Sequence, residues 1–297
     1  MRIGIDLGGT KTEGVVMDDA GSVLVRERRS TPSSAGYDAV LNTLRDLVRD
    51  LEQRANTQCM VGIGTPGTVS ARTGRMKNSN TVSLNDRCLK QDLEQRLQRT
   101  VRVANDANCF VLSEATDGAA QRYSVVFGVI MGTGVGGGIA IDKVVHRGPQ
   151  SIAGEWGHNV LEVDGPVCYC GKRGCVETLI SGPGLEGDYR AHTGRQLCAE
   201  EIVAQAAQGE ADAEAAMQRF LDRYGRALAA VINILDPDAI VLGGGLSNIG
   251  RLYSEGRRCV ACHIFSDELI TPILRNRHGD SSGVRGAAHL WPPAFTC

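Results

Sequence analysis

One histidine and three cysteines lie close together in the middle of the chain, at spacings typical of a metal site. They belong to the segments 154–158 (Gly-Glu-Trp-Gly-His) and 168–177 (Cys-Tyr-Cys-Gly-Lys-Arg-Gly-Cys-Val-Glu). Three thiolates and one imidazole complete the tetrahedral coordination that zinc prefers, and the glycines permit the tight turn that such a knuckle needs. The alternative is a chance gathering in a chain with ten cysteines. Because four protein ligands leave no open position, we expect a structural Zn²⁺ ion bound by His158, Cys168, Cys170 and Cys175.

A second chemical group is the carboxylate of Asp106, in the segment Asn105-Asp106-Ala107-Asn108. We expect this segment to follow a strand at 101–104 and to begin a helix that ends near residue 119. At the N-terminus of a helix an aspartate is often simply the cap. At the end of a buried strand, beside an amide, it is also suited to act as a general base on a hydroxyl group. The sequence leaves both interpretations open.

Two glycine-rich turns separate pairs of expected strands, one in each half of the chain. The first, Gly8-Gly9-Thr10-Lys11, comes directly after Asp6 and Leu7, and the second is Gly132-Thr133-Gly134 with the glycines that follow it. Such turns let backbone N–H groups approach an anion, although each alone could be an ordinary hairpin turn. The Walker pattern is absent, and the formal dinucleotide patterns beginning at Gly62 and Gly132 have no helix after them. The repetition suggests two related domains that hold one polyphosphate.

Two further segments have polar or glycine-rich character. The triplet Gly243-Gly244-Gly245 follows a buried strand expected at 238–242, where either a nucleoside or tightly packed backbone can come close. The loop 77–85, which includes Asn80, is rich in amides and hydroxyls. This loop can bind a polyol or can simply be solvated.

The hydrophobic periodicity predicts an alternation of strands and amphipathic helices around these groups. The strands are expected at residues 2–7, 12–18, 22–29, 60–64, 101–104, 124–131, 139–142 and 238–242. The helices are expected at residues 37–53, 92–97, 106–119, 184–192, 199–208, 211–235 and 283–291.

Length and composition limit the class of protein. The 297 residues suggest two domains or one large one, and 42% hydrophobic residues allow a substantial core. The formal net charge of −2 argues against a general nucleic-acid or membrane surface, even with Lys172 and Arg173 at the knuckle. We see neither a signal peptide nor an apolar run that could span a bilayer. The seven other cysteines are scattered, as expected for reduced thiols in a cytoplasmic protein.

These segments together resemble the ROK family of bacterial sugar kinases and repressors, over essentially the whole chain. The resemblance implies an α/β chain of two domains with the sugar kinase–Hsp70–actin (ribonuclease H-like) fold and a cleft for ATP and sugar between the domains. It suggests an N-terminal domain at 1–118, with a helix at about 283–297 packed back on it, and a C-terminal domain at 119–282 that carries the zinc arm. A homodimer is also suggested by the family.

The resemblance implies a role for each motif. Asp106 would be the general base, and Mg²⁺ would lie near Asp6. Phosphoryl transfer mainly requires in-line positioning and neutralised charge. The residues implied for the sugar are Asn80, Asn105, Asp106, Glu155, His158 and Glu177, and those for ATP are Asp6, Gly8, Gly9, Thr10, Lys11, Gly132, Thr133, Gly134, Gly243 and Gly244. We also expect His158 to bind zinc through one ring nitrogen and to donate from the other to a sugar hydroxyl.

The segments 153–159 and 278–288 are most similar to the bacterial fructokinases of the mannofructokinase type. We therefore expect transfer of the ATP γ-phosphate to the 6-hydroxyl of a hexose, with D-fructose preferred and mannose or glucose as further candidates. One departure is the loop 81–86, Thr-Val-Ser-Leu-Asn-Asp, which lacks the tryptophan expected before Leu-Asn. N-acetylglucosamine kinase is the alternative within the family. A sugar-responsive regulator is the alternative from another class, but only Met1 precedes the first strand, where a helix-turn-helix domain would be expected.

Overall fold

The structure, a computed structural model, describes residues 1–79 and 81–292. The chain divides into two compact units. Unit 1 comprises Met1–Arg122, Ile139–Ala153 and Arg277–Cys297, and unit 2 comprises Tyr123–Gly138 and Gly154–Asn276. Residues 139–153 therefore group with unit 1, and the domain limits expected from the sequence stay a prediction. Among the described residues, no helix combines the length and the hydropathy required to cross a bilayer.

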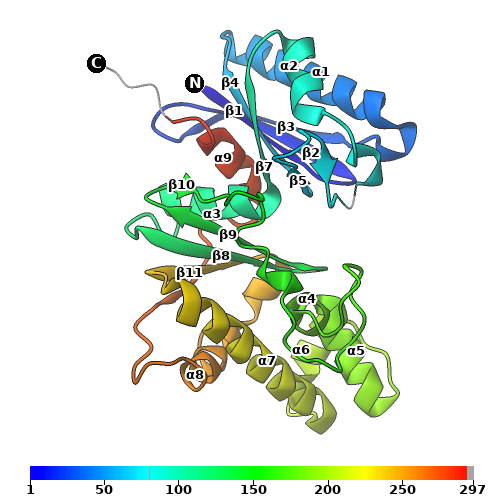
Figure 1. Ribbon diagram of the computed structural model, residues 1–297, viewed down its shortest axis with the longest axis vertical. Coiled ribbons are helices and arrows are strands. Elements are labelled where there is room, and N and C mark those ends of the chain that lie inside the picture. Colours follow the sequence, from blue (N-terminus) through cyan, green and yellow to red (C-terminus); the bar gives the residue numbers. More distant parts are fainter. Residues whose placement is uncertain (80, 293–297) are drawn as a thin grey trace. The chain divides into compact units, whose positions relative to one another are not determined.

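The core of unit 1 is a five-stranded mixed sheet with the order β3-β2-β1-β4-β7 (Figure 1). Strands β1, β2 and β3 form two antiparallel pairs, whereas β4 and β7 run parallel to β1. Strand β7 is last in the order and is therefore an edge strand. The strands are β1 (Arg2–Leu7), β2 (Lys11–Met17), β3 (Val23–Ser30), β4 (Met60–Thr65) and β7 (Val101–Asn105), and a small separate pair is formed by β5 (Thr68–Val69) and β6 (Met76–Lys77).

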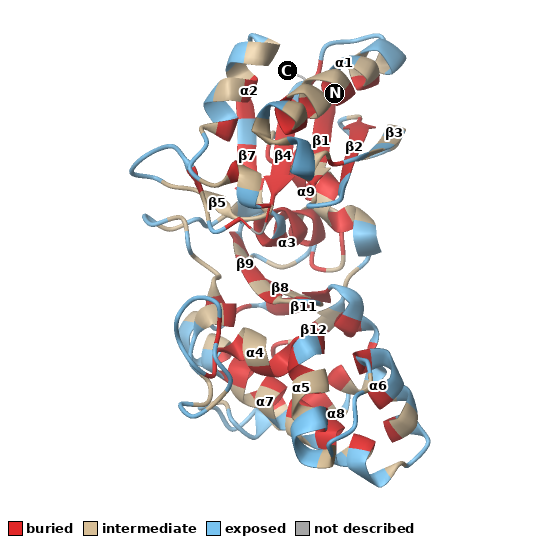
Figure 2. Cartoon of the chain, turned by 90° about the vertical axis from the view of Figure 1, so that its right-hand side faces the viewer, coloured by how far each residue is buried: buried red, intermediate tan, exposed pale blue. Residues whose placement is uncertain are grey.

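Helices cover both faces of this sheet (Figure 2). On one face lie α1 (Tyr37–Ala55) and α2 (Leu89–Leu97), and on the other lie α3 (Asp106–Thr116) and α9 (Ser282–His289). The apolar positions of α1 are buried against the strands, as their helical spacing predicts. Helix α9 rests directly on the backbone of the sheet, because a Cβ atom at Gly4 or Gly62 would lie about 2 Å from a carbonyl oxygen of α9.

Unit 2 contains most of a second five-stranded sheet, with the order β10-β9-β8-β11-β12. Strand β11 is parallel to β8 and β12, and β9 continues from unit 2 into unit 1. The strands are β8 (Val125–Met131), β9 (Val135–Ile141), β10 (Val144–Val145), β11 (Ala239–Gly243) and β12 (Ile273–Arg275).

The helices of unit 2 gather on one face of its sheet (Figures 1 and 2). Helix α7 is central and contacts four others, and its Phe220 and Tyr224 are completely buried with Tyr189 of α5. These helices are α4 (Val176–Ile180), α5 (Gly182–Thr193), α6 (Ala199–Ala207), α7 (Ala211–Leu235) and α8 (Glu255–Ala261). Short 3₁₀ helices occur at η1 (Ser33–Ala35), η2 (Val82–Leu84), η3 (Trp156–His158), η4 (Gly245–Asn248), η5 (Gly250–Leu252) and η6 (Gly279–Ser281).

Candidate functional site

The junction of β7 and α3 in unit 1 carries the candidate base. Asn105 is the last residue of the strand, and its Oδ1 atom accepts a hydrogen bond from the backbone N–H of Asn108 at 2.8 Å. Asn105 is therefore the N-cap of α3. Asp106 is the first helical residue, and its Oδ1 accepts from the N–H of Ala107 at 2.9 Å. The interpretation of Asp106 as the cap is wrong, since its neighbour already has that task.

Three carboxylates lie near one another in unit 1. Burial is the main reason why the pKa of Asp6 is raised to about 6, and the negative charges of Asp106 and Glu13 raise it further. The surrounding protein also raises the pKa of Asp106 by desolvation, although this side chain keeps an exposed surface and two backbone N–H groups oppose the shift. A carboxylate with a raised pKa is a stronger proton acceptor, which suits a general base.

Glu13 is a member of this group that the sequence analysis missed. It is 5% exposed, and its two oxygens accept from Arg26 at 2.8 Å and Arg28 at 2.6 Å. Glu13 lies directly opposite Asp6 in the antiparallel pair of β1 and β2. The signal was available, because two strands joined by a short turn place residues at equal distances from the turn opposite each other.

The first glycine turn joins β1 to β2. Gly8 donates its N–H to the carbonyl oxygen of Lys11 at 2.9 Å, and a Cβ at Gly8 would lie 2.8 Å from the same oxygen. The turn is supported from β3, since Thr31 Oγ1 donates to the Gly8 carbonyl at 2.8 Å. Gly9, Thr10 and Lys11 are exposed. The tip can therefore present backbone N–H groups and one ammonium group to an anion.

The second and third glycine segments meet in unit 2. Gly244, with φ +78°, packs so closely on the end of β8 that a Cβ would lie 2.2 Å from the carbonyl oxygen of Met131. Gly245 N lies 4.0 Å from the Cβ position of Gly132. The structure thus brings together two of the three segments that the resemblance assigns to ATP. The third segment belongs to unit 1.

Glu177 lies against the second glycine turn, a contact that the sequence did not indicate. Its Oε2 atom accepts from the backbone N–H of Val135 at 3.0 Å, and a Cβ at Gly134 would lie 2.6 Å from that oxygen. Glu177 is in the first turn of α4, and Cys175 is the N-cap of this helix. The metal set is therefore linked to the glycine turn through only two residues of chain.

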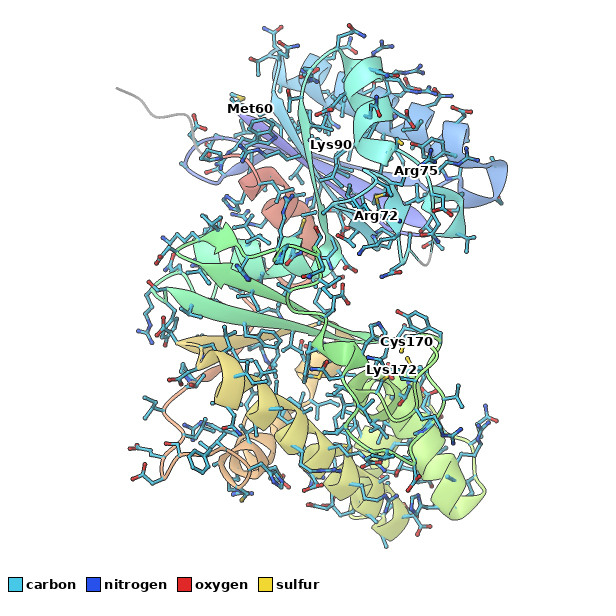
Figure 3. All side chains as sticks on the ribbon, in the orientation of Figure 1. Met60, Arg72, Arg75, Lys90, Cys170 and Lys172 are labelled. Atoms are coloured by element: carbon cyan, nitrogen blue, oxygen red, sulfur yellow. The ribbon has the colours of Figure 1, made fainter. Side chains whose placement is uncertain are left out.

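The four expected metal ligands converge on one point. One donor atom from each lies within 4.8 Å of those of the other three, with Cys168 Sγ 3.6 Å from His158 Nδ1 and Cys170 Sγ 3.6 Å from Cys175 Sγ. Two sulfur ligands of a tetrahedral zinc ion are about 3.8 Å apart, so the set fits Zn²⁺. Figure 3 labels Cys170 and Lys172, which lie on the arm that leads into α4.

The knuckle depends on Gly174. This residue has φ +61°, and a Cβ there would lie 1.5 Å from the carbonyl oxygen of Glu162. Gly171 also has a positive φ, +89°, but nothing lies within 4 Å of its Cβ position. Gly174 is therefore required both by its positive φ and by the close approach of the Glu162 backbone, whereas Gly171 is favoured only by its positive φ.

The second ring nitrogen of His158 is already engaged, contrary to our expectation. Its Nε2 atom is 3.0 Å from the hydroxyl of Tyr169, and the two rings meet edge to face with centroids 5.2 Å apart. The prediction of a free N–H is wrong, because the turn between Cys168 and Cys170 folds the intervening tyrosine back onto the imidazole. The sugar contact that the resemblance implies for His158 would require displacement of the Tyr169 hydroxyl or a contact through it.

The other expected site residues divide between the units. Unit 1 contains Asp6, the first glycine turn, Asn105 and Asp106, whereas unit 2 contains the other two glycine segments, the metal set, Glu155 and Glu177. Asn80 lies outside the described residues.

Comparisons with known proteins identify the family of the chain. The model of the ROK family matches residues 2–294. The chain is 39% identical to an N-acetyl-D-glucosamine kinase of Photobacterium profundum, over 98% of this chain and 99% of that protein.

Two solved structures are similar in fold and sequence. A ROK hexokinase from Thermus thermophilus has a TM-score of 0.87 and 32% identity, over 97% of this chain and 96% of that one. A ROK family glucokinase from Streptomyces griseus, solved with glucose and AMPPNP, has a TM-score of 0.79 and 28% identity, over 97% and 98% of the two chains. The predicted fold class, a two-domain α/β chain of the actin-like type, is confirmed by these likenesses.

Proposed function

Because the chain belongs to the ROK family and the three relatives named above are sugar kinases, we propose that it phosphorylates N-acetyl-D-glucosamine at the 6-hydroxyl with ATP. The preference for D-fructose expected from the sequence is not confirmed. The name of the N-acetyl-D-glucosamine kinase from Photobacterium profundum instead supports the alternative that the sequence analysis kept.

The observation that carries the reaction is the position of Asp106. It follows the last residue of β7, it does not cap α3, and desolvation raises its pKa. In the proposed step the Asp106 carboxylate accepts the proton of the sugar 6-hydroxyl. The hydroxyl oxygen forms a bond to the γ-phosphorus while the bond from that phosphorus to the β,γ-bridging oxygen breaks, and ADP leaves.

The phosphate groups of ATP are assigned to the glycine turns, whose tips can direct backbone N–H groups at an anion. Lys11 adds a positive charge at the exposed tip of the first turn. Burial is the main cause of the raised pKa of Asp6, and the charges of Asp106 and Glu13 add to it, so a cation beside Asp6 would offset an unfavourable charge. A carboxylate oxygen is a suitable ligand for Mg²⁺. When bound there, Mg²⁺ would neutralise charge on the β- and γ-phosphates.

The zinc arm is assigned to sugar recognition. Zn²⁺ held by His158, Cys168, Cys170 and Cys175 would fix the segment that carries Glu155 and the start of α4 that carries Glu177. The support is the close set of donor atoms and the hydrogen bond from Val135 N–H to Glu177. Tyr169 joins these residues as a candidate sugar contact through its hydrogen bond with His158.

A panel of sugars tests the proposal. Turnover of ATP is measured by a coupled assay with N-acetyl-D-glucosamine, D-fructose, D-mannose and D-glucose. We expect the highest kcat/KM with N-acetyl-D-glucosamine. A higher value with one of the other sugars would overturn the choice of substrate, and absence of turnover with all four would overturn the kinase assignment.

A further inference from the structure

Unit 1 contains a cavity of about 1060 Å³ at its edge strand. Its walls come from the start of β7, the later turns of α3, the hairpin and loop at 143–151 and the residues that follow α9. This volume slightly exceeds the usual range for small-molecule sites, about 300–1,000 Å³, and is much larger than an inorganic phosphate ion requires.

The charge of the cavity differs from that of the whole chain. The lining contains six basic residues, and none of the described residues that line it is an aspartate or a glutamate. The chain as a whole has a formal net charge of −2, so this concentration of one sign is local. The basic residues are Arg2, Lys90, Arg102, Lys143, Arg147 and His289.

Arg2 is built into the wall and is not fully satisfied. It is 2% exposed, and its two Nη atoms donate to the carbonyl oxygens of Trp291 at 3.2 Å and Asp18 at 2.9 Å. His289 Nδ1 lies 3.4 Å from Arg2 Nη1, and the other ring nitrogen of His289 lies 3.1 Å from Asp117. The Nε atom of Arg2 is buried without a hydrogen-bond partner among the described residues. The Arg2 guanidinium therefore adds a fixed positive charge to this wall, although Asp18, Asp19 and Asp117 lie near enough to act on that charge.

Two cations of the rim are less engaged than Arg2. The side chains of Lys143 and Arg147 are exposed and make neither a hydrogen bond nor an ion pair within residues 1–79 and 81–292. Lys90 has a carboxylate partner, Glu94, at 3.8 Å. Arg102 donates to the Leu290 carbonyl and lies over the Trp291 ring, 4.1 Å from its centroid. Lys143 and Arg147 can therefore bind an anion without breaking an existing contact.

The remaining lining is mostly apolar. Valines from β5, β7 and β10 and the Trp291 ring form a surface that a phosphate group alone would leave exposed. Basic groups around an apolar wall fit a ligand with a phosphate and an organic body. We propose that this cavity binds an organic phosphate, such as a sugar phosphate or a nucleoside diphosphate.

The proposed site is separate from the candidate catalytic residues but shares elements with them. Arg102 lies near the start of β7 and Asp106 follows its end, about 13 Å away for four residues of extended chain. Leu112 and Thr116 of α3, the helix that begins with Asp106, also line the cavity. Both elements that position Asp106 thus have one end at the proposed site.

Calorimetry on the full chain tests the proposal. The probes are uridine 5′-diphosphate, glucose 6-phosphate and inorganic phosphate, added to protein saturated with AMPPNP and N-acetyl-D-glucosamine so that the candidate catalytic residues are occupied. The test variant is Lys143→Ala/Arg147→Ala, because neither side chain makes a hydrogen bond or an ion pair with the part of the chain that the structure describes. The control is Arg49→Ala/Arg72→Ala, which removes two exposed arginines of unit 1 outside the lining (Figure 3 labels Arg72 and Lys90).

We expect wild-type protein and the control variant to bind at least one of the two phosphate esters, and more tightly than inorganic phosphate. The Lys143→Ala/Arg147→Ala variant should bind that ester at least about tenfold more weakly, since it removes two charge-assisted hydrogen bonds to the phosphate group. Arg102→Ala should weaken binding in the same direction. Failure of the wild type to bind either ester at millimolar concentration, or equal binding by the test and control variants, would overturn the site. If inorganic phosphate bound as tightly as the ester, the inference that the ligand has an organic body would be overturned. These outcomes are independent of whether the chain phosphorylates N-acetyl-D-glucosamine, because the variants localise the binding.

Discussion

Glu114 is the residue through which α3 holds the C-terminal segment of unit 1, and its replacement by glutamine should weaken that unit strongly. The side chain is completely buried. Its Oε2 accepts from the N–H groups of Ala119 at 2.9 Å and Arg277 at 3.0 Å, and its Oε1 accepts from His278 N–H at 3.3 Å and Ser282 Oγ at 2.8 Å. Four donors therefore surround one carboxylate: one from the turn that follows α3, two from residues 277–278 and one from α9.

In Glu114→Gln the side chain keeps its shape, but one of its two polar atoms becomes an NH₂ group that faces two donors. At about 1.5–3 kcal/mol for each hydrogen bond to a charged group, the loss of two such bonds should lower the free energy of unfolding by about 3–6 kcal/mol. The damage should reach the candidate site, because α3 begins with Asp106 and Gly283 of α9 lies beside the Asp6 carboxylate.

Urea unfolding followed by the fluorescence of Trp291 measures this effect. The chain has two tryptophans, and Trp156 is in unit 2, so a Trp156→Phe background leaves a reporter in unit 1 alone. Trp291 donates its Nε1–H to the Val61 carbonyl at 2.8 Å and therefore reports the docking of the segment on β4. The control Asp19→Asn, at an exposed position, should change the stability by less than about 0.5 kcal/mol. If Glu114→Gln were as mild as this control, the reasoning about the four donors would be refuted.

Three further predictions concern the candidate site. Because the pKa of Asp6 is raised to about 6 in the fold, the folded state favours the protonated carboxyl, and this contribution to stability should be lost as the pH rises from about 4 to 6. Asp6→Asn should therefore flatten the pH dependence of Tm over that range. An unchanged slope would contradict the raised pKa. Removal of zinc by a chelator should raise the KM for the sugar more than that for ATP, and full activity in folded, zinc-free protein would contradict the role of the arm. Gly174→Ala should abolish stoichiometric zinc binding, since its Cβ would meet the Glu162 carbonyl oxygen at 1.5 Å. Gly171→Ala has the strain of a positive φ without the clash and should retain the metal. Equal zinc content in the two variants would count against this explanation.

Much of the fold follows from local patterns in the sequence. The helical period of the apolar residues predicts α1 and α7, and the glycine turn between two apolar runs predicts the β1–β2 hairpin. The gathering of His158, Cys168, Cys170 and Cys175 could also be predicted, because the four residues are close in the sequence. In each case the signal and the structure that it produces lie within the same short stretch of chain.

The contacts that the sequence did not predict join segments that are far apart in it. The hydrogen bond from Val135 N–H to Glu177 crosses 42 positions, and the contact of Tyr169 with His158 depends on the path of the knuckle in space. The basic cavity of unit 1 is the clearest case, since its cations come from five separate segments with no common motif. The preferred sugar could not be predicted for a different reason: a preference between hexoses depends on a few side-chain positions rather than on the motifs that identify a family.

The central claim is that Asp106 removes a proton from the 6-hydroxyl of N-acetyl-D-glucosamine. The most direct test compares kcat of wild-type protein, Asp106→Asn and the control Asp267→Asn, which changes an exposed aspartate of unit 2, with sugar binding to each measured by calorimetry. Asparagine is similar in shape but cannot accept the proton, so kcat should fall by about 10²–10⁴-fold while the sugar still binds. A wild-type kcat in Asp106→Asn would contradict the account.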